Sequence, residues 1–303
     1  MNSTASRRQM LLEKLNSHAS FFEDRGRIGK LLGAPEKMVV SEFSKRSGIV
    51  SGKKISTFWG GDMHITLPEP VSTFLYRYGY FEEGLTAFFI RALKKGDTFM
   101  DVGSHYGYFS LLALEMIGPE GKVIAFEPTP RTYAVLNSNL SAFPNAKTEN
   151  MAAWSEDSTL ELTDLGIGWS SHNSLMVPKM VPDRAAKHAQ THSVRAVKLD
   201  DYIAENNVRP TLMKIDAESA ELAILTGMTE TMRNLRPIIS VEVGDDSAVT
   251  VKSSEVLEFA SRYGYQHLAY ANGEIVRHEI QNAYDYDNIF MTPEEKVADL
   301  LDQ

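Results

Sequence analysis

Apolar runs and segments of helical spacing alternate along most of the chain. Residues 98–102 form a short apolar run typical of a buried parallel strand, and residues 108–116 then place leucines at helical spacing. Further apolar runs predict strands at 122–128, 148–153, 211–215, 238–243, 266–270 and 289–292. This alternation predicts an α/β fold with a doubly wound, mostly parallel sheet and helices on both faces.

The first 77 residues have a different pattern, which predicts an N-terminal extension of helices and a hairpin. Residues 1–48 are polar and compatible with helix, with an amphipathic turn at 10–15. Residues 53–67 are typical of a hairpin around the Gly-Gly-Asp at 60–62. A helix through 85–93 should end at Gly96, before the first core strand. We therefore expect an extension at 1–77 and a ligand-binding domain at 78–303.

One connection is unusually long. Residues 164–192 have little pattern, and loops of this length in compact domains are usually lids or disordered segments. The stretch carries Trp169, His172 and His188. We favour a lid over the substrate, and a mobile surface loop is the alternative.

A glycine-containing turn separates the first core strand from its helix. Asp101, Gly103 and Gly107 lie between them. Glycines permit a sharp turn and a close approach to a ligand, and the N–H groups at a helix start favour an anionic group such as a carboxylate. Open α/β folds bind ligands at this carboxyl edge of the sheet. A tight turn without a ligand is the alternative interpretation.

The spacing of these glycines narrows the choice of ligand. A dinucleotide fingerprint would need glycine where His105 and Tyr108 stand, which disfavours a nicotinamide-dependent oxidoreductase. A phosphate-binding P-loop is also absent, because no Gly-Lys-Ser/Thr follows. An amino-acid-like tail fits the turn better, and S-adenosylmethionine has such a tail together with a ribose and an adenine.

An acid ends the second predicted core strand. Glu127 follows the apolar run directly, and Pro128 and Pro130 then end the strand and open a helix. An acid at this place in a βαβ unit can accept hydrogen bonds from both ribose hydroxyls. The alternative is a solvated surface glutamate, which its position after an apolar run disfavours.

Four segments together resemble the FkbM family of S-adenosylmethionine-dependent methyltransferases. They are the Asp-x-Gly turn at 101–107, Phe-Glu-Pro at 126–128, the Lys-Ile-Asp-x-Glu segment within 212–221, and Asn-Ile-Phe-Met at 288–291. The resemblance covers residues 78–293. It implies a Rossmann-like methyltransferase fold and O-methylation of a hydroxyl on a sugar or small natural product. A non-catalytic binding or scaffolding protein that keeps this fold is the alternative, and the intact turn and Glu127 disfavour it.

The resemblance also implies where the cofactor binds. Glu82 would pair with the ammonium group of S-adenosylmethionine, and Thr86 would cap or contact it; an ordinary helix start is the alternative. Cofactor contacts are expected at Glu82, Thr86, Asp101, Gly103, Ser104, Tyr106, Gly107, Glu127, Pro128, Ala152, Ala153 and Asp216. Family members usually carry asparagine where His105 stands and glycine where Ser219 stands, so His105 has room for a role particular to this protein.

Methyl transfer to a hydroxyl needs a base, and the sequence offers several. In a regular strand Lys214, Asp216 and Glu218 would share one face, whereas a turn after Asp216 would put Glu218 at the next helix start. We expect Glu218 to be the base beside Asp216, with an ordinary acidic helix start as the alternative. His105 is a rival because imidazole titrates near neutrality, and His172 is a third candidate.

A metal site is the less favoured interpretation of the acidic strand ends. Asp216, Glu242, Asp245 and Asp246 fall at or near adjacent predicted strand ends and could hold Mg²⁺. No tight ligand spacing supports this, so we expect no metal. Asp245 and Asp246 are otherwise turn residues.

Composition agrees with an enzyme acting on small molecules. The chain has 303 residues, enough for a full α/β core and an appendage. The net charge of −9, without a long basic run, argues against a nucleic-acid partner. The absence of cysteine excludes thiolate catalysis and Cys-ligated zinc. No apolar stretch predicts a membrane span or signal peptide, so we expect a cytoplasmic protein with a small-molecule or glycan acceptor; whether it forms a homo-oligomer stays open.

Overall fold

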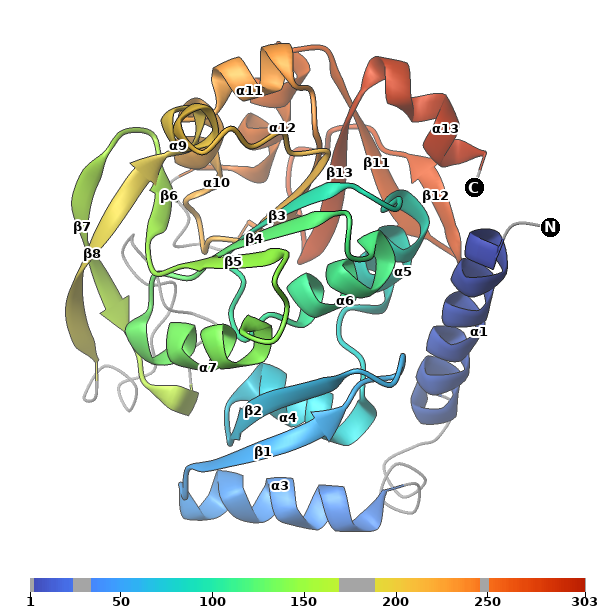
Figure 1. Cartoon of the computed structure of the whole chain (residues 1–303), viewed down its shortest axis with the longest axis vertical. Helices are drawn as coiled ribbons and strands as arrows, with labels where there is room; N and C mark the ends of the chain where they lie inside the picture. The colour runs from blue at the N-terminus through green and yellow to red at the C-terminus, as the bar shows by residue number, and fades with distance from the viewer. Residues whose placement is uncertain (1–2, 24–33, 169–188, 246–250, 303) are drawn as a thin grey trace.

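An eight-stranded sheet forms the centre of the computed structural model, which describes residues 3–23, 34–168, 189–245 and 251–302. The strand order is β12-β11-β13-β10-β9-β3-β4-β5 (Figure 1). Five neighbouring strands are parallel: β5 (Ala146–Glu149), β4 (Lys122–Phe126), β3 (Thr98–Val102), β9 (Leu212–Ile215) and β10 (Ile238–Val243). Three antiparallel strands complete it: β13 (Asp287–Pro293), β11 (Tyr265–Ala271) and β12 (Glu274–Arg277). The predicted α/β class and mostly parallel sheet are confirmed.

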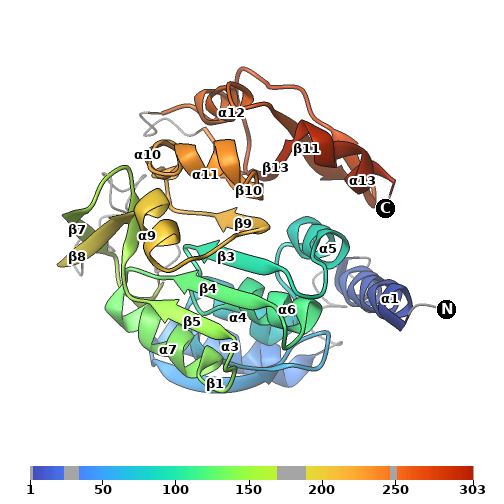
Figure 2. The same cartoon turned by 45° about the horizontal axis from the view of Figure 1, so that its top comes forward.

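Helices cover both faces of the sheet because its strands are apolar on both sides. Phe99 and Val123 belong to one hydrophobic cluster, while their neighbours Met100 and Ile124 belong to another. The first cluster includes residues of α5 (Glu83–Ala92), α6 (Tyr108–Ile117) and α7 (Pro130–Leu140). Residues of α9 (Leu199–Glu205), α10 (Glu221–Thr226), α11 (Thr229–Asn234) and α12 (Ser253–Ser261) belong to the second, and Figure 2 shows these two helical layers.

The N-terminal residues are packed onto the core. Residues of β2 (Asp62–Leu67), α4 (Pro70–Tyr78) and α1 (Ser3–Glu23) share the hydrophobic cluster of α5 and α6. β2 pairs with β1 (Ser51–Ser56) in the predicted hairpin, and α3 (Pro35–Ser47) lies beside it in Figure 1. At the other end of the chain lie η2 (Glu294–Lys296) and α13 (Val297–Leu301). None of the helices in the described ranges combines the length and apolar character needed to cross a membrane.

The single strand predicted at 148–153 is wrong. The chain leaves the main sheet after Glu149, and β6 (Ala152–Trp154) joins a separate sheet of order β6-β8-β7. Asn150 lies at the break, where its side-chain amide donates to the carbonyl oxygens of Glu127 (2.9 Å) and Pro128 (3.1 Å). This contact fixes the bend between the two strands, which an apolar pattern does not reveal.

The weakly patterned connection at 164–192 is bounded by two strands, which overlap it only at its ends. β7 (Ser158–Asp164) and β8 (Gln190–Lys198) form an antiparallel pair, in register from Ser158 opposite Ala196 to Asp164 opposite Gln190. The predicted lid, with Trp169, His172 and His188, lies outside the described residues.

The glycine turn is required by contacts within the chain. Gly103 has φ +77°, and a Cβ built on it would lie 1.8 Å from the carbonyl oxygen of Asp216. Gly107 has φ +85°, and a Cβ there would lie 2.7 Å from Cδ1 of Leu136. The ends of β3 and β9 therefore approach each other at a distance that only glycine permits. Sequence reasoning attributed this requirement to a ligand, whereas the chain itself imposes it.

Replacing Gly103 by alanine should destabilise the fold more than its backbone angle alone explains. Gly96 is the matched control, because it has φ +81° but no atom within 4 Å of the place that a Cβ would take. We expect Gly96→Ala to lower the free energy of unfolding by about 1 kcal/mol and Gly103→Ala by about 3 kcal/mol or more. Urea unfolding measures both. Equal losses would contradict the close contact with Asp216.

Candidate functional site

A cavity of about 660 Å³ opens at the carboxyl ends of β3, β4, β9 and β10. This is the edge at which open α/β sheets bind ligands. The predicted site residues that line it are Glu82, Gly103, Ser104, His105, Tyr106, Glu127, Pro128, Ala152, Ala153, Asp216 and Glu218. The N-terminal residues contribute as well, since Met63 of β2 and Val71 and Leu75 of α4 form part of the wall.

Three residues predicted to contact the cofactor lie behind the cavity wall. The Thr86 hydroxyl donates to the carbonyl oxygen of Phe81 at 2.6 Å, and its side chain is buried. Asp101 is fully buried, and its Oδ2 accepts a hydrogen bond from the Ser110 hydroxyl at 2.6 Å. Gly107 is the N-cap of α6. Asp101 and Gly107 belong to the segment around the turn, whereas Thr86 lies in α5.

The carboxylate of Glu127 is held at the end of β4 by two backbone amides. The N–H of Thr129 donates to Oε1 at 2.9 Å, and the N–H of His105 donates to Oε2 at 3.1 Å. Burial, partly offset by these hydrogen bonds, raises the pKa of Glu127 to about 7. The carboxylate therefore titrates near neutrality, and it borders the cavity.

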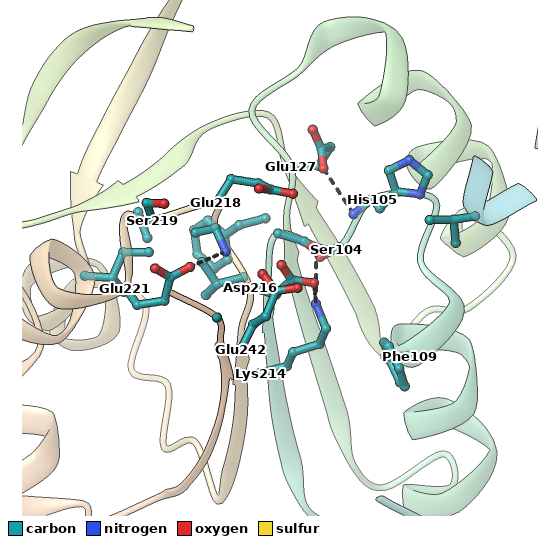
Figure 3. Close-up of a pocket in the computed structure, with 18 of the residues that line it drawn as sticks. Ser104, His105, Phe109, Glu127, Lys214, Asp216, Glu218, Ser219, Glu221 and Glu242 are labelled. Atoms are coloured by element: carbon teal, nitrogen blue, oxygen red, sulfur yellow. Dashed lines mark hydrogen bonds and ion pairs between the residues drawn. The ribbon is translucent and has the colours of Figure 1, made fainter. Parts of the chain in front are cut away.

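Lys214 is the buried cation of the site. It is 3% exposed, and its Nζ donates to Oδ2 of Asp216 at 2.8 Å and to the carbonyl oxygen of Gly103 at 3.3 Å (Figure 3). Burial alone would lower the pKa of Lys214, but the carboxylates of Asp216 and Asp101 raise it above its ordinary value. The ammonium group of Lys214 therefore links the end of β3, through the carbonyl oxygen of Gly103, to the end of β9, through the carboxylate of Asp216.

The chain turns immediately after Asp216. β9 ends at Ile215, and Glu218 and Ser219 have φ values of +48° and +78°. Of the two arrangements that the sequence left open, the turn after Asp216 is the one that forms, so Lys214, Asp216 and Glu218 do not share one face of a regular strand. The positive φ of Ser219 explains why a glycine is usual at this position. Glu221 then accepts the N–H of Ala217 at 3.0 Å, which closes the turn.

Glu242 is a cavity residue that sequence reasoning considered only as a metal ligand. It lies near the end of β10, opposite Asn288 of β13, and Figure 3 shows it beside Lys214 and Asp216. Burial, followed by repulsion from Asp216 and Glu218, raises the pKa of Glu242 well above its ordinary value. The sequence feature that could have identified Glu242 is the one that identified Glu127, an acidic residue at the end of an apolar strand.

Glu82 is held between distant parts of the chain. The Tyr286 hydroxyl donates to its Oε1, and the side-chain amide of Asn288 donates to its Oε2 at 3.4 Å. Burial and the nearby Asp216 raise the pKa of Glu82, while these hydrogen bonds oppose the shift. Glu82 thus faces the same cavity as Asp216.

The side chain of His105 points away from these acids. In Figure 3 the ring is directed away from Glu218 and Asp216. It stacks on Tyr106 with centroids 4.2 Å apart, and its Nε2 lies 3.7 Å from Oε1 of the fully buried Glu69. Burial lowers the pKa of His105, although Glu69 opposes the shift. The positive φ of 50° suits His or Asn better than most residues.

The described residues contain no group of three or more His, Asp or Glu side chains arranged to hold a metal ion. Asp245 serves a turn, because its Oδ1 accepts from the N–H of Ser253 at 2.8 Å and its Oδ2 from the N–H of Tyr284 at 3.1 Å. Asp246 lies outside the described residues.

Comparison with known proteins identifies the family. The profile of the methyltransferase FkbM domain matches residues 101–267, more than half of the chain, so the protein belongs to the FkbM methyltransferase family. The methyltransferase sdnD of Sordaria araneosa is 29% identical over 196 residues, which are 56% of this chain and 74% of that protein. The hexuronic acid methyltransferase AglP of Haloferax volcanii is 22% identical over 170 residues, covering 54% of this chain and 64% of that protein. The protein is therefore a methyltransferase.

Solved structures give more distant likenesses. An FkbM methyltransferase from Methylobacillus flagellatus superposes with a TM-score of 0.40 at 13% identity, covering 72% of this chain and 52% of that chain. Aeropyrum pernix fibrillarin with bound S-adenosyl-L-methionine gives a TM-score of 0.40 at 14% identity, covering 69% of this chain and 74% of that chain.

The cavity suits S-adenosylmethionine, the cofactor expected from the sequence and from the family. The carboxylate of Glu127 can accept hydrogen bonds from ribose hydroxyls, and the acidic side chains near Asp216 can accept hydrogen bonds from an ammonium group. Apolar side chains of Phe126, Met151 and Leu162 line another part of the cavity and offer surface for an adenine ring. S-adenosylmethionine is the methyl donor of this enzyme.

Removing the buried cation should destabilise the protein strongly. Lys214→Met would leave Asp101 and Asp216 without their compensating charge, and we expect a loss of about 3–5 kcal/mol in the free energy of unfolding. The control Lys54→Met breaks an exposed ion pair with Asp62 (2.7 Å) and should cost less than about 1 kcal/mol. Adding Asp101→Asn to Lys214→Met should recover part of the loss. Denaturant titration that gives similar losses for both lysines would refute this role.

Proposed function

We propose that the enzyme transfers a methyl group to a hydroxyl oxygen of a sugar or another small hydroxylated compound. The observation that carries this proposal is the turn at 216–219, which directs Glu218 into the cavity beside Asp216. A hydroxyl must lose its proton as its oxygen attacks, so a carboxylate next to the methyl donor is the group that the reaction needs.

We assign each polar group of the cofactor to a residue of the cavity wall. We assign the ribose hydroxyls to Glu127, whose carboxylate is fixed by two backbone amides. We assign the ammonium group to Glu82, which Tyr286 and Asn288 hold in place. Ser104 and Pro128 border the same space. Bound here, the cofactor supplies an electrophilic methyl carbon next to a positively charged sulfur.

We assign the proton transfer to Glu218. The acceptor oxygen forms a bond to the methyl carbon while the carbon–sulfur bond breaks, and the hydroxyl proton passes to the Glu218 carboxylate. Asp216 is less suited to be the base, because its Oδ2 already accepts a hydrogen bond from Nζ of Lys214 at 2.8 Å. His105 is also less suited, because its ring is directed toward Tyr106 and Glu69. Asp216 acts by fixing the wall of the site.

Cofactor affinity should increase with pH around the pKa of Glu127. The protonated carboxyl is a poorer acceptor for two hydroxyls, so affinity should be about tenfold weaker one pH unit below this pKa of about 7 than well above it. Calorimetry with S-adenosylmethionine across this range tests the sign. Glu127→Gln should bind more weakly at high pH, by about 1.5–3 kcal/mol, and should lose the pH dependence. A folded variant with wild-type affinity would overturn the ribose assignment.

Replacing the proposed base should impair turnover more than binding. Glu218→Gln keeps size and polarity but removes the proton acceptor, and kcat should fall by about 10²–10⁴-fold while the cofactor Kd stays near that of the wild type. His105→Asn, which restores the residue usual in the family, is the matched comparison and should retain most activity. An active Glu218→Gln enzyme beside an inactive His105→Asn enzyme would reverse the assignment.

A further inference from the structure

The wall of the cavity has an unusual balance of charge. Its described residues include eight carboxylates, whereas Lys214 is the sole lysine or arginine among them. That lysine is 3% exposed and already donates to Asp216 and to the carbonyl oxygen of Gly103. His105 adds no compensating charge, since burial favours its neutral form. The wall of the cavity therefore carries an excess of acidic groups, and the raised pKa values of Glu82, Glu127 and Glu242 show that a further negative charge is unfavourable there.

Most of these carboxylates already have a structural task. Asp245 accepts backbone N–H groups in its turn, Glu221 accepts that of Ala217, and Glu127 accepts those of Thr129 and His105. Asp216 is paired with Lys214. These interactions fix the acids in position along the cavity wall.

Glu242 and Asp285 have none of these structural tasks, and Glu242 is the one beside the strand that leads to Asp216. No hydrogen bond or ion pair joins its carboxylate to the residues that the structure describes. It lies beside β9, the strand that leads to Asp216, and opposite Asn288, which holds Glu82. The carboxylate is thus placed among other acids, where a second negative group from a ligand would be repelled and a hydroxyl or an ammonium group would be accommodated as a donor.

We infer that the acceptor is a hydroxylated compound without negative charge, either neutral or amine-bearing, and that Glu242 helps to exclude acceptors bearing a carboxylate or phosphate. This inference rests on the proposed function and narrows its substrate class. It separates the enzyme from its relative in Haloferax volcanii, whose name specifies a hexuronic acid, a carboxylate-bearing sugar. S-adenosylmethionine is compatible with the same wall because its ammonium and sulfonium charges outweigh its single carboxylate.

The test sorts methylated products by charge. The full-length enzyme is incubated with methyl-labelled S-adenosylmethionine and a small-molecule extract of the source organism, divided beforehand by ion exchange into anionic, neutral and cationic pools. We expect label in the neutral or cationic pool. Label concentrated in the anionic pool would overturn the inference while supporting methyl transfer. No label in any pool, with cofactor binding intact by calorimetry, would count against the proposed function.

Variants test the part played by Glu242. At a pH high enough to deprotonate Glu242 despite its raised pKa, Glu242→Gln should raise the share of label in the anionic pool by about tenfold or more, because one repelling charge is then removed. The control Glu274→Gln changes an exposed acid of β12 outside the cavity and should leave the distribution unchanged. If Glu242→Gln does not fold, added salt gives a second measurement on the wild-type enzyme, since screening should increase anionic labelling. An unchanged distribution in both measurements would refute the exclusion.

Discussion

The close approach of β3 and β9 is the constraint on which the site depends. The carbonyl oxygen of Asp216 occupies the space where any side chain at residue 103 would begin. Lys214 completes the junction, donating to Gly103 on one strand end and to Asp216 on the other. The residues that follow β3 and β9 form two walls of the cavity. The junction therefore fixes the distance between these walls before any ligand binds.

The same junction also affects the pKa values of the acidic residues in the cavity. A single buried lysine is paired with Asp216, and burial followed by repulsion from Asp216 raises the pKa of Glu242 and of Glu82. Each acid thus depends on its neighbours for its protonation state. Such mutual repulsion costs stability, and perturbed groups of this kind are more typical of functional sites than of structural ones.

The N-terminal residues take part in the site as well as in the core. Met63, Val71 and Leu75 line the cavity, and the buried Glu69 lies beside the ring of His105. The histidine that departs from the family's usual asparagine therefore faces the part of the chain that precedes the alternating strands and helices. The extension and His105 thus form part of the same cavity wall.

Local pattern in the sequence determined most strands of the main sheet and the glycine turn, because apolar runs and strand-end acids are signals within a few residues of each other; it missed the edge strand β12. Strand 238–243 and the helix start at Tyr108 are where the pattern predicted them. Tertiary structure alone decided the break after Glu149, the direction of the His105 ring and the grouping of Glu82 with Asn288. These features depend on contacts between residues far apart in the chain, whose distances no local pattern records.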